Sequence, residues 1–131
     1  MERKAGYAGG SVRNDAPFEI RERTFQFAVR VVQAVRCLPK SFDGLEVGRQ
    51  LIRSGTSIAA NVEEAHGAES QRDFIHKMGL ARKEARESRY WLRLADATFS
   101  GNGSEIPSLA QEADELVRIL SAIITTAKKH I

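Results

Sequence analysis

Four arginines recur at helical spacing near the middle of the chain and could bind phosphate groups. Steps of four, three and four residues place them on one stripe of a helix: Arg82, Arg86, Arg89 and Arg93. A guanidinium presents a planar fork of N–H donors that suits phosphate oxygens. The stripe predicts binding to a nucleic-acid backbone without sequence choice, because no aromatic platform for base stacking accompanies it. The alternative is a solvated helix face whose arginines pair with carboxylates.

A second group of residues is typical of close helix packing. Small side chains are concentrated in residues 54–60. Three polar side chains in or just after this segment share a helix face, where they can bond to another helix or to carbonyls one turn back. Farther along, an aromatic pair interrupts a charged face and could anchor a partner. The predicted subunit interface is therefore Ser54, Ser57, Asn61, Tyr90 and Trp91. Packing inside one chain and a ligand pocket are the alternatives.

Metal and catalytic chemistry find weaker support. Glu63 and His66, like Asp73 and His76, have the i, i+3 spacing of di-iron bundle ligands. All four lie one step off the apolar seams, however, so a metal-binding bundle is the lowest-ranked alternative. Cys37 has no evident histidine or aspartate partner, and no glycine-rich phosphate loop precedes a helix. The sequence predicts no catalytic residue, no metal and no cofactor.

The composition indicates a single soluble domain. The chain has 131 residues, 42% of them hydrophobic and 28% charged, with a formal net charge of +3. No apolar run approaches the roughly 20 residues that span a bilayer, and the first residues lack the apolar centre of a secretion signal. With one cysteine there is no intramolecular disulfide. We expect a cytoplasmic protein without membrane contact.

The hydrophobic pattern predicts four helices after a flexible, glycine-rich arm at residues 1–15. They should cover about residues 18–38, 44–66, 70–99 and 104–130. Each has an apolar seam. In the first helix it is Phe18, Phe25, Ala28, Val32 and Val35, with Phe27, Val31, Ala34 and Leu38 beside it; in the second it is Leu51, Gly55, Ile58, Val62 and Ala65. The third runs Phe74, Met78, Ala81, Ala85, Ser88, Leu92, Ala95 and Phe99, and the fourth Ile106, Leu109, Ala113, Leu116, Leu120, Ile123 and Ala127.

Capping residues support these boundaries. Pro17 fits a first helical turn, and Pro39 ends the first helix. The second helix should start with a capping box of Asp43 and Glu46, and the third with a weaker one of Ser70 and Asp73. Two further residues complete the set, with Gly67 predicted to close the second helix in a left-handed conformation and Ser104 to cap the fourth.

Short connections near residues 39–43, 67–69 and 100–103 turn consecutive helices back on one another. Residues 16–131 are therefore predicted to form an all-α, up-down-up-down antiparallel four-helix bundle. An isolated coiled coil is the alternative, which the capped turns disfavour. The helices over 18–38 and 70–99 carry an excess of basic residues, whereas the helix over 44–66 is acidic.

The run from Ile52 to Glu64, then Ser70 to Phe74, Ala81 to Ala85 and Glu87 to Leu92, resembles the bacterial four-helix-bundle protein family, also called the 23S ribosomal RNA intervening-sequence protein family. It is similar as well to the accessory protein of diversity-generating retroelements. The resemblance extends over roughly residues 20–129. Two segments depart from it, namely Glu64 to Gly67, where many members have Ala-Glu-Gly, and Lys83-Glu84, where a Gly-Ser pair is common.

The resemblance implies a cytosolic homopentameric ring of bundles without catalytic activity, and its retroelement branch implies association with nucleic acid or a reverse transcriptase. Together with the basic stripe, it predicts a self-assembling scaffold or accessory protein that binds RNA or an RNA-handling enzyme. A purely structural protein assembly without nucleic acid is the alternative function.

Overall fold

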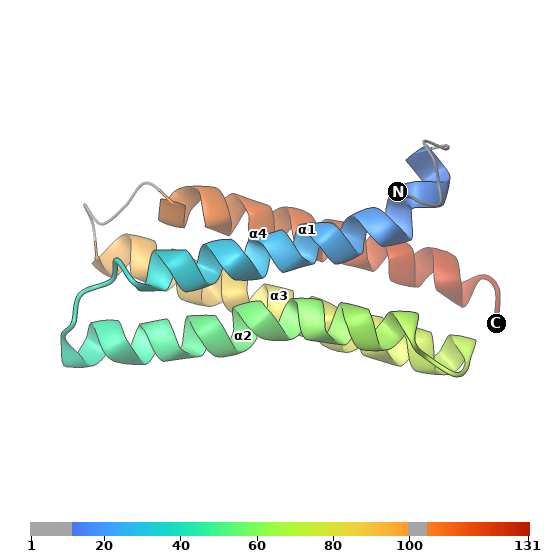
Figure 1. The fold of residues 1–131 in the computed structure, drawn as a ribbon, viewed down its shortest axis with the longest axis horizontal. Helices are drawn as coiled ribbons and strands as arrows, with labels where there is room; N and C mark the ends of the chain where they lie inside the picture. Colours follow the sequence, from blue (N-terminus) through green and yellow to red (C-terminus); the bar gives the residue numbers. More distant parts are fainter. Residues whose placement is uncertain (1–11, 100–104) are drawn as a thin grey trace.

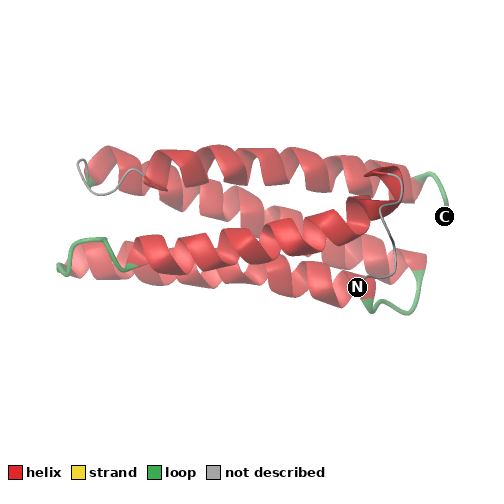
Figure 2. Cartoon of the chain, turned by 45° about the horizontal axis from the view of Figure 1, so that its top comes forward, coloured by secondary structure: helices red, strands yellow, loops and turns green. Residues whose placement is uncertain are grey.

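The computed structural model describes residues 12–99 and 105–131, with side chains from Glu19 onward. Four helices run antiparallel in chain order, namely α1 (Val12–Val35), α2 (Phe42–His66), α3 (Gln71–Thr98) and α4 (Glu105–Lys128) (Figure 1). No strand occurs in this described part, as Figure 2 makes plain. The predicted all-α four-helix bundle is confirmed. Most of the predicted arm, Phe18 as a core residue and Ser104 as a cap lie outside what the structure describes.

The first helix is shifted toward the N-terminus relative to its predicted bounds. It begins at Val12 instead of Phe18 and ends at Val35, three residues before the predicted end at Leu38. No glycine or proline occurs in residues 11–16, so nothing in the backbone stops a helix there. Pro17 consequently lies at the sixth position of α1 and not in its first turn. The other three helices start and end within two residues of their predicted bounds.

Two of the predicted caps are corrected. The N-cap of α2 is Ser41, whose hydroxyl accepts the Gly44 N–H at 3.3 Å, and Asp43 is already inside the helix. The Asp43 carboxylate also accepts the Gly44 N–H, at 3.0 Å, so a serine and an aspartate share one donor. Gly67 does end α2, but with φ −100°, which is not the left-handed conformation. Ser70 caps α3 as predicted by accepting the backbone N–H of Asp73 at 3.0 Å.

The core follows the predicted seams of α2 and α3 and most of that of α4. All five predicted seam residues of α2 are buried, and so are the six central ones of α3: Met78, Ala81, Ala85, Ser88, Leu92 and Ala95. Phe74 and Phe99, at the two ends of the α3 seam, are half-buried. In α4 the seam shifts by one residue near its end, where Ile124 is buried and Ile123 is half-buried.

The predicted seam of α1 is wrong. Phe25 is 55% exposed, and Ala28, Val32 and Val35 are only half-buried. The residues that enter the core are mainly those expected to flank the seam, together with two others: Ile20, Thr24, Phe27, Val31, Ala34 and Leu38. Thr24 is buried because its hydroxyl donates to the Ile20 carbonyl at 2.8 Å. This helix therefore carries two apolar stripes, of which the bundle uses one.

Packing of α1 is uneven. It approaches α2 closely because Gly55 lies against Val31, and a Cβ at Gly55 would come within 3.0 Å of a Val31 methyl group. Between α1 and α4 the contact is sparse. Ion pairs cross that gap. Arg23 donates to both carboxylate oxygens of Glu112, with the shorter distance 2.7 Å. Arg30 is bonded to Glu105 at 2.9 Å.

Candidate nucleic-acid and subunit interfaces

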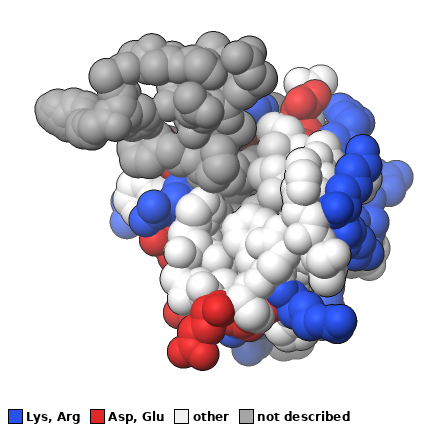
Figure 3. Space-filling model, turned by 90° about the vertical axis from the view of Figure 1, so that its right-hand side faces the viewer, with Lys and Arg blue, Asp and Glu red and all other residues white. Residues whose placement is uncertain are grey.

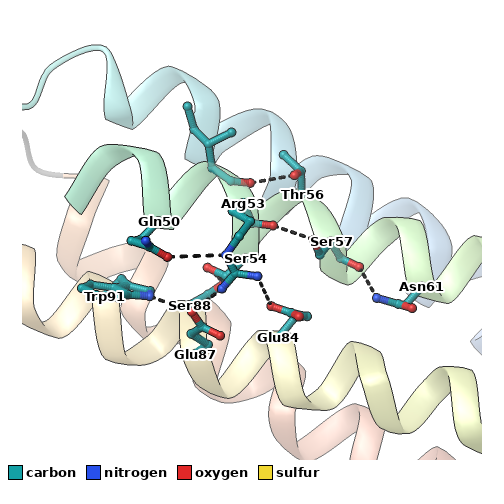
Figure 4. Close-up of polar contacts among 11 residues, drawn as sticks. Gln50, Arg53, Ser54, Thr56, Ser57, Asn61, Glu84, Glu87, Ser88 and Trp91 are labelled. Atoms are coloured by element: carbon teal, nitrogen blue, oxygen red, sulfur yellow. Dashed lines mark hydrogen bonds and ion pairs between the residues drawn. The ribbon is translucent and has the colours of Figure 1, made fainter. Parts of the chain in front are cut away.

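Of the three polar residues predicted as an interface, Ser54 serves the α2–α3 contact, whereas Ser57 and Asn61 bond to carbonyls of their own helix. Ser54 is fully buried and accepts a hydrogen bond from the Ser88 hydroxyl of α3 at 2.9 Å. Ser57 donates to the Arg53 carbonyl and Asn61 to the Ser57 carbonyl, each one turn back in α2 (Figure 4). Ser54 therefore cannot touch another molecule unless the bundle opens. Internal packing, the stated alternative, therefore accounts for Ser54, whereas the half-buried Ser57 and Asn61 stay a predicted interface.

An ionic cluster covers the outer side of the same contact. Arg53 of α2 reaches between Glu84 and Glu87 of α3 and pairs with both carboxylates (Figure 4). The Trp91 indole N–H donates to Glu87 at 3.1 Å. Hydrogen bonds from Arg53 and then from Trp91 hold the pKa of the Glu87 carboxyl below its usual range. Trp91 is half-buried and fixed within its own chain, whereas Tyr90 beside it is 55% exposed.

The predicted arginine stripe is divided between two environments. Arg89 pairs with Asp114 of α4 at 2.7 Å, and Arg82 donates to the Ser121 hydroxyl of α4 at 3.3 Å. The Arg89 hydrogen bond is the largest cause of the lowered pKa of Asp114. Arg86 and Arg93 are exposed, and neither has a hydrogen bond or ion pair with any residue that the structure describes. Half of the stripe therefore ties α3 to α4 and only half faces solvent.

A different row of α3 residues forms the fully outward face. Each of them stands two positions before a residue of the α3 seam, which is about 200° around the helix and hence opposite the core. We call this row the outer α3 line: Arg72, His76, Gly79, Lys83, Arg86, Tyr90 and Arg93. The row contains no carboxylate. Apart from Gly79, which is half-buried, every member is exposed, and a Cβ at Gly79 would meet open space.

The cations of the outer α3 line are available for a ligand. No hydrogen bond or ion pair within the described structure involves Arg72, Lys83, Arg86 or Arg93, although Lys83 is near enough to Glu87 to help lower the pKa of that carboxyl. From Arg72 to Arg93 the line extends over roughly 32 Å of helix axis. In the end view of Figure 3, many basic side chains gather along the right-hand edge of the molecule, with acidic ones at the upper end of that edge.

An apolar face extends from the α1–α2 connection along the surface of α1, where no interface was predicted. Phe42 is 91% exposed, and Leu45 of α2 and Phe25 of α1 are each more than half exposed. Two hollows adjoin these residues. One is lined mainly by Leu38, Pro39, Leu45, Gly48 and Ile52, the other by Phe25, Ala28, Val29 and Val32, and both include Arg36. We call this surface the apolar α1–α2 face. The sequence indicated this face indirectly, because the α1 segment carries more apolar residues than a single core-facing stripe requires.

The residues with metal-ligand spacing serve other contacts. Glu63 pairs with Arg21 at 2.9 Å, and this hydrogen bond lowers the pKa of the Glu63 carboxyl. His66 lies with Nδ1 2.9 Å from the Val62 carbonyl oxygen and packs edge-on against Phe74. Within the described ranges no three His, Cys, Asp or Glu side chains are placed to hold a metal ion. Cys37 is exposed.

Comparison with known proteins agrees with this architecture. The model of the 23S rRNA-intervening sequence protein family matches residues 17–122, which is most of the chain. The chain belongs to this family. It is also similar to a solved structure from Bacteroides thetaiotaomicron, described as a protein of unknown function from the S23 ribosomal protein family. The two are 34% identical with a TM-score of 0.76, over 84% of this chain and 98% of the other.

The family resemblance predicted from the sequence is thereby confirmed. None of the curated proteins compared matches the chain significantly. Among the described helices, none is long and apolar enough to cross a membrane.

Proposed function

We propose that this protein is a non-enzymatic, self-assembling accessory factor of the cytoplasm that binds RNA along the outer α3 line. The observation that supports RNA binding is the row of exposed cations at Arg72, Lys83, Arg86 and Arg93, without a carboxylate among them. Most other arginines of the described chain are already paired with carboxylates. A row of free cations costs stability by mutual repulsion, and a polyanion lying along it would remove that cost. The retroelement branch of the family resemblance, which implies association with nucleic acid or a reverse transcriptase, favours RNA as this polyanion.

Binding of this kind is dominated by phosphate contacts. Each cation that neutralises a phosphate of a single strand contributes about −0.7 to the slope of log affinity against log salt, so four contacts predict a slope of about −3 for one chain. In an assembly with several copies of the line the affinity would rise through multivalency. A non-enzymatic role is consistent with the engagement of Glu63 by Arg21 and of His66 by the Val62 carbonyl.

The test is an RNA titration over a salt series with two variants of equal charge. One variant replaces Arg72, Arg86 and Arg93 with Gln. The control replaces three exposed cations away from the line and from the apolar α1–α2 face with Gln, namely Arg118, Lys128 and Lys129. We expect the salt slope of the first variant to be shallower by about 2, while the control keeps most of its affinity. Equal losses in both variants would mean that only net charge matters, and absence of binding at low salt would refute RNA binding.

We infer that self-assembly uses the apolar α1–α2 face. Large apolar side chains exposed on one face are typical of an interface, and burial there would remove Phe42, Leu45 and Phe25 from water. The adjoining hollows offer places for such side chains of a second copy. The resemblance to bundles that form homopentamers supports a closed ring of five. A purely structural assembly, without RNA, is the second candidate function and rests on this face alone.

Particle mass at micromolar concentration tests this inference. We expect Leu45→Gln combined with Phe25→Ser to lower the mass of the particle while the helical circular dichroism stays unchanged. Ile131→Ser is the matched control, because Ile131 is 65% exposed and apolar but lies at the C-terminus, away from the face. A particle whose mass is unchanged in the double variant would refute this interface, and a monomeric wild-type protein would refute self-assembly itself.

A further inference from the structure

One exposed aromatic side chain interrupts the cations of the outer α3 line, although the sequence pattern indicated no aromatic platform beside the arginine stripe. Tyr90 stands between Arg86, four residues earlier, and Arg93, three residues later, and its side chain is 55% exposed. The two arginines are about 10 Å apart along the helix axis, with the ring between them. Neither arginine has a hydrogen bond or ion pair with a described residue. A flat aromatic ring with a free guanidinium on each side suits one nucleotide and its neighbouring phosphates.

The Tyr90 ring is supported from behind. It meets the Trp91 ring edge to face, with centroids 5.0 Å apart and an interplanar angle of 74°. Trp91 is in turn bonded to Glu87, and Glu87 is paired with Arg53 of α2 (Figure 4). This chain of contacts limits the positions open to Tyr90. Because an already positioned ring loses little freedom when a ligand stacks on it, the arrangement favours binding.

We propose that the RNA bound by this protein is single-stranded, with one base stacked on Tyr90 and its flanking phosphates on Arg86 and Arg93. In a duplex each base is already stacked and paired, so its face is not open to a side chain on a straight helix. Stacking tolerates any base, so the site selects unpaired RNA without selecting a sequence. This inference rests on the proposed RNA binding, and the experiment below separates the two.

The probes are a fluorescein-labelled oligoadenylate and an abasic oligomer with the same number of phosphates. We expect the wild type to bind the oligoadenylate about fivefold or more tighter than the abasic oligomer, the usual effect of one stacked base. Tyr90→Leu should remove this preference, whereas Tyr90→Phe, which keeps the ring, should retain it. Emission from Trp91, the only tryptophan of the chain, should change with the oligoadenylate and not with the abasic oligomer.

Other outcomes would overturn the inference. Equal affinity of the wild type for both probes, with strong salt dependence, would refute base stacking and leave phosphate binding in place. A preference that survives in Tyr90→Leu would mean that bases are bound elsewhere, and tighter binding of a duplex of equal length would refute selection of single strands. No binding of any probe at low salt would refute the proposed function together with this inference.

Discussion

Removal of the buried Ser54–Ser88 hydrogen bond is a direct test of the role assigned to Ser54. Both side chains are fully buried, and the Ser88 hydroxyl donates to the Ser54 oxygen at 2.9 Å. In Ser54→Ala the Ser88 hydroxyl loses this acceptor, which costs about 1–3 kcal/mol when no other is found. A helical serine can turn toward the carbonyl one turn back. We therefore expect a loss near the lower end, about 1–1.5 kcal/mol.

The double variant, with both Ser54→Ala and Ser88→Ala, should lose less free energy of unfolding than the two single variants lose in sum. When both serines become alanine, no hydroxyl remains without a partner, and alanine favours the helix by up to about 0.5 kcal/mol per site. We expect the double variant to lie within about 0.5 kcal/mol of the wild type. The summed stability losses of Ser54→Ala and Ser88→Ala should then exceed the loss of the double variant by about 2 kcal/mol.

Urea unfolding at one fixed protein concentration provides the measurement, because assembly would make stability depend on concentration. With a slope of about 1–3 kcal/mol per molar urea, a loss of 1.5 kcal/mol moves the midpoint by roughly 0.5–1.5 M. Ser57→Ala is the control, since the Ser57 hydroxyl only bonds to a carbonyl of its own helix. The reasoning would be refuted if each single variant were within about 0.5 kcal/mol of the wild type and the two stability losses added up in the double variant. So would a changed particle mass in Ser54→Ala.

Two further outcomes follow from the same helix contacts. Gly55→Val should lower the free energy of unfolding by about 1–3 kcal/mol because its Cβ would lie 3.0 Å from a Val31 methyl group, and Val31→Ala in that background should recover part of the loss in urea unfolding; full stability of Gly55→Val would contradict the close approach. The lowered pKa of Glu87 means that its pairing with Arg53 stabilises the fold above the unfolded pKa and is lost as the pH falls through the folded one. Between about pH 5 and pH 3 the stability of Glu87→Gln should therefore fall less steeply than that of the wild type, and parallel pH curves would contradict it.

The sequence determined the architecture. Seams at alternating steps of three and four predicted the buried faces of α2 and α3 because each helix has one apolar stripe, and one apolar stripe can face only the core. Ser70 was identified as a cap from its spacing to Asp73 alone, since the cap bond is local. The family could also be recognised, because the run from Ile52 to Glu64 is unbroken in the sequence.

Tertiary structure decided which of several equivalent faces is used. α1 has apolar residues on two sides, and the pattern favoured the side of Phe25. The folded chain instead buries Phe27, and Val31 of the same helix packs against Gly55 of α2. The sequence likewise grouped Arg89 with Arg86, although Arg89 lies at the contact between α3 and α4 and Arg86 faces solvent. Arg89 reaches Asp114 of α4, a residue 25 positions away, whereas Arg86 reaches solvent.

The sequence could not separate Tyr90, which belongs to the candidate RNA site on the outer α3 line, from Trp91, which does not. Tyr90 and Trp91 are adjacent in the sequence and were predicted to act together, but consecutive residues of a helix point about 100° apart. Trp91 turns toward the Arg53 cluster and Tyr90 toward solvent among the free arginines. The periodicity of one helix fixes which residues share a face. Which face meets a neighbouring helix and which meets water depends on the long-range contacts that only the folded chain makes.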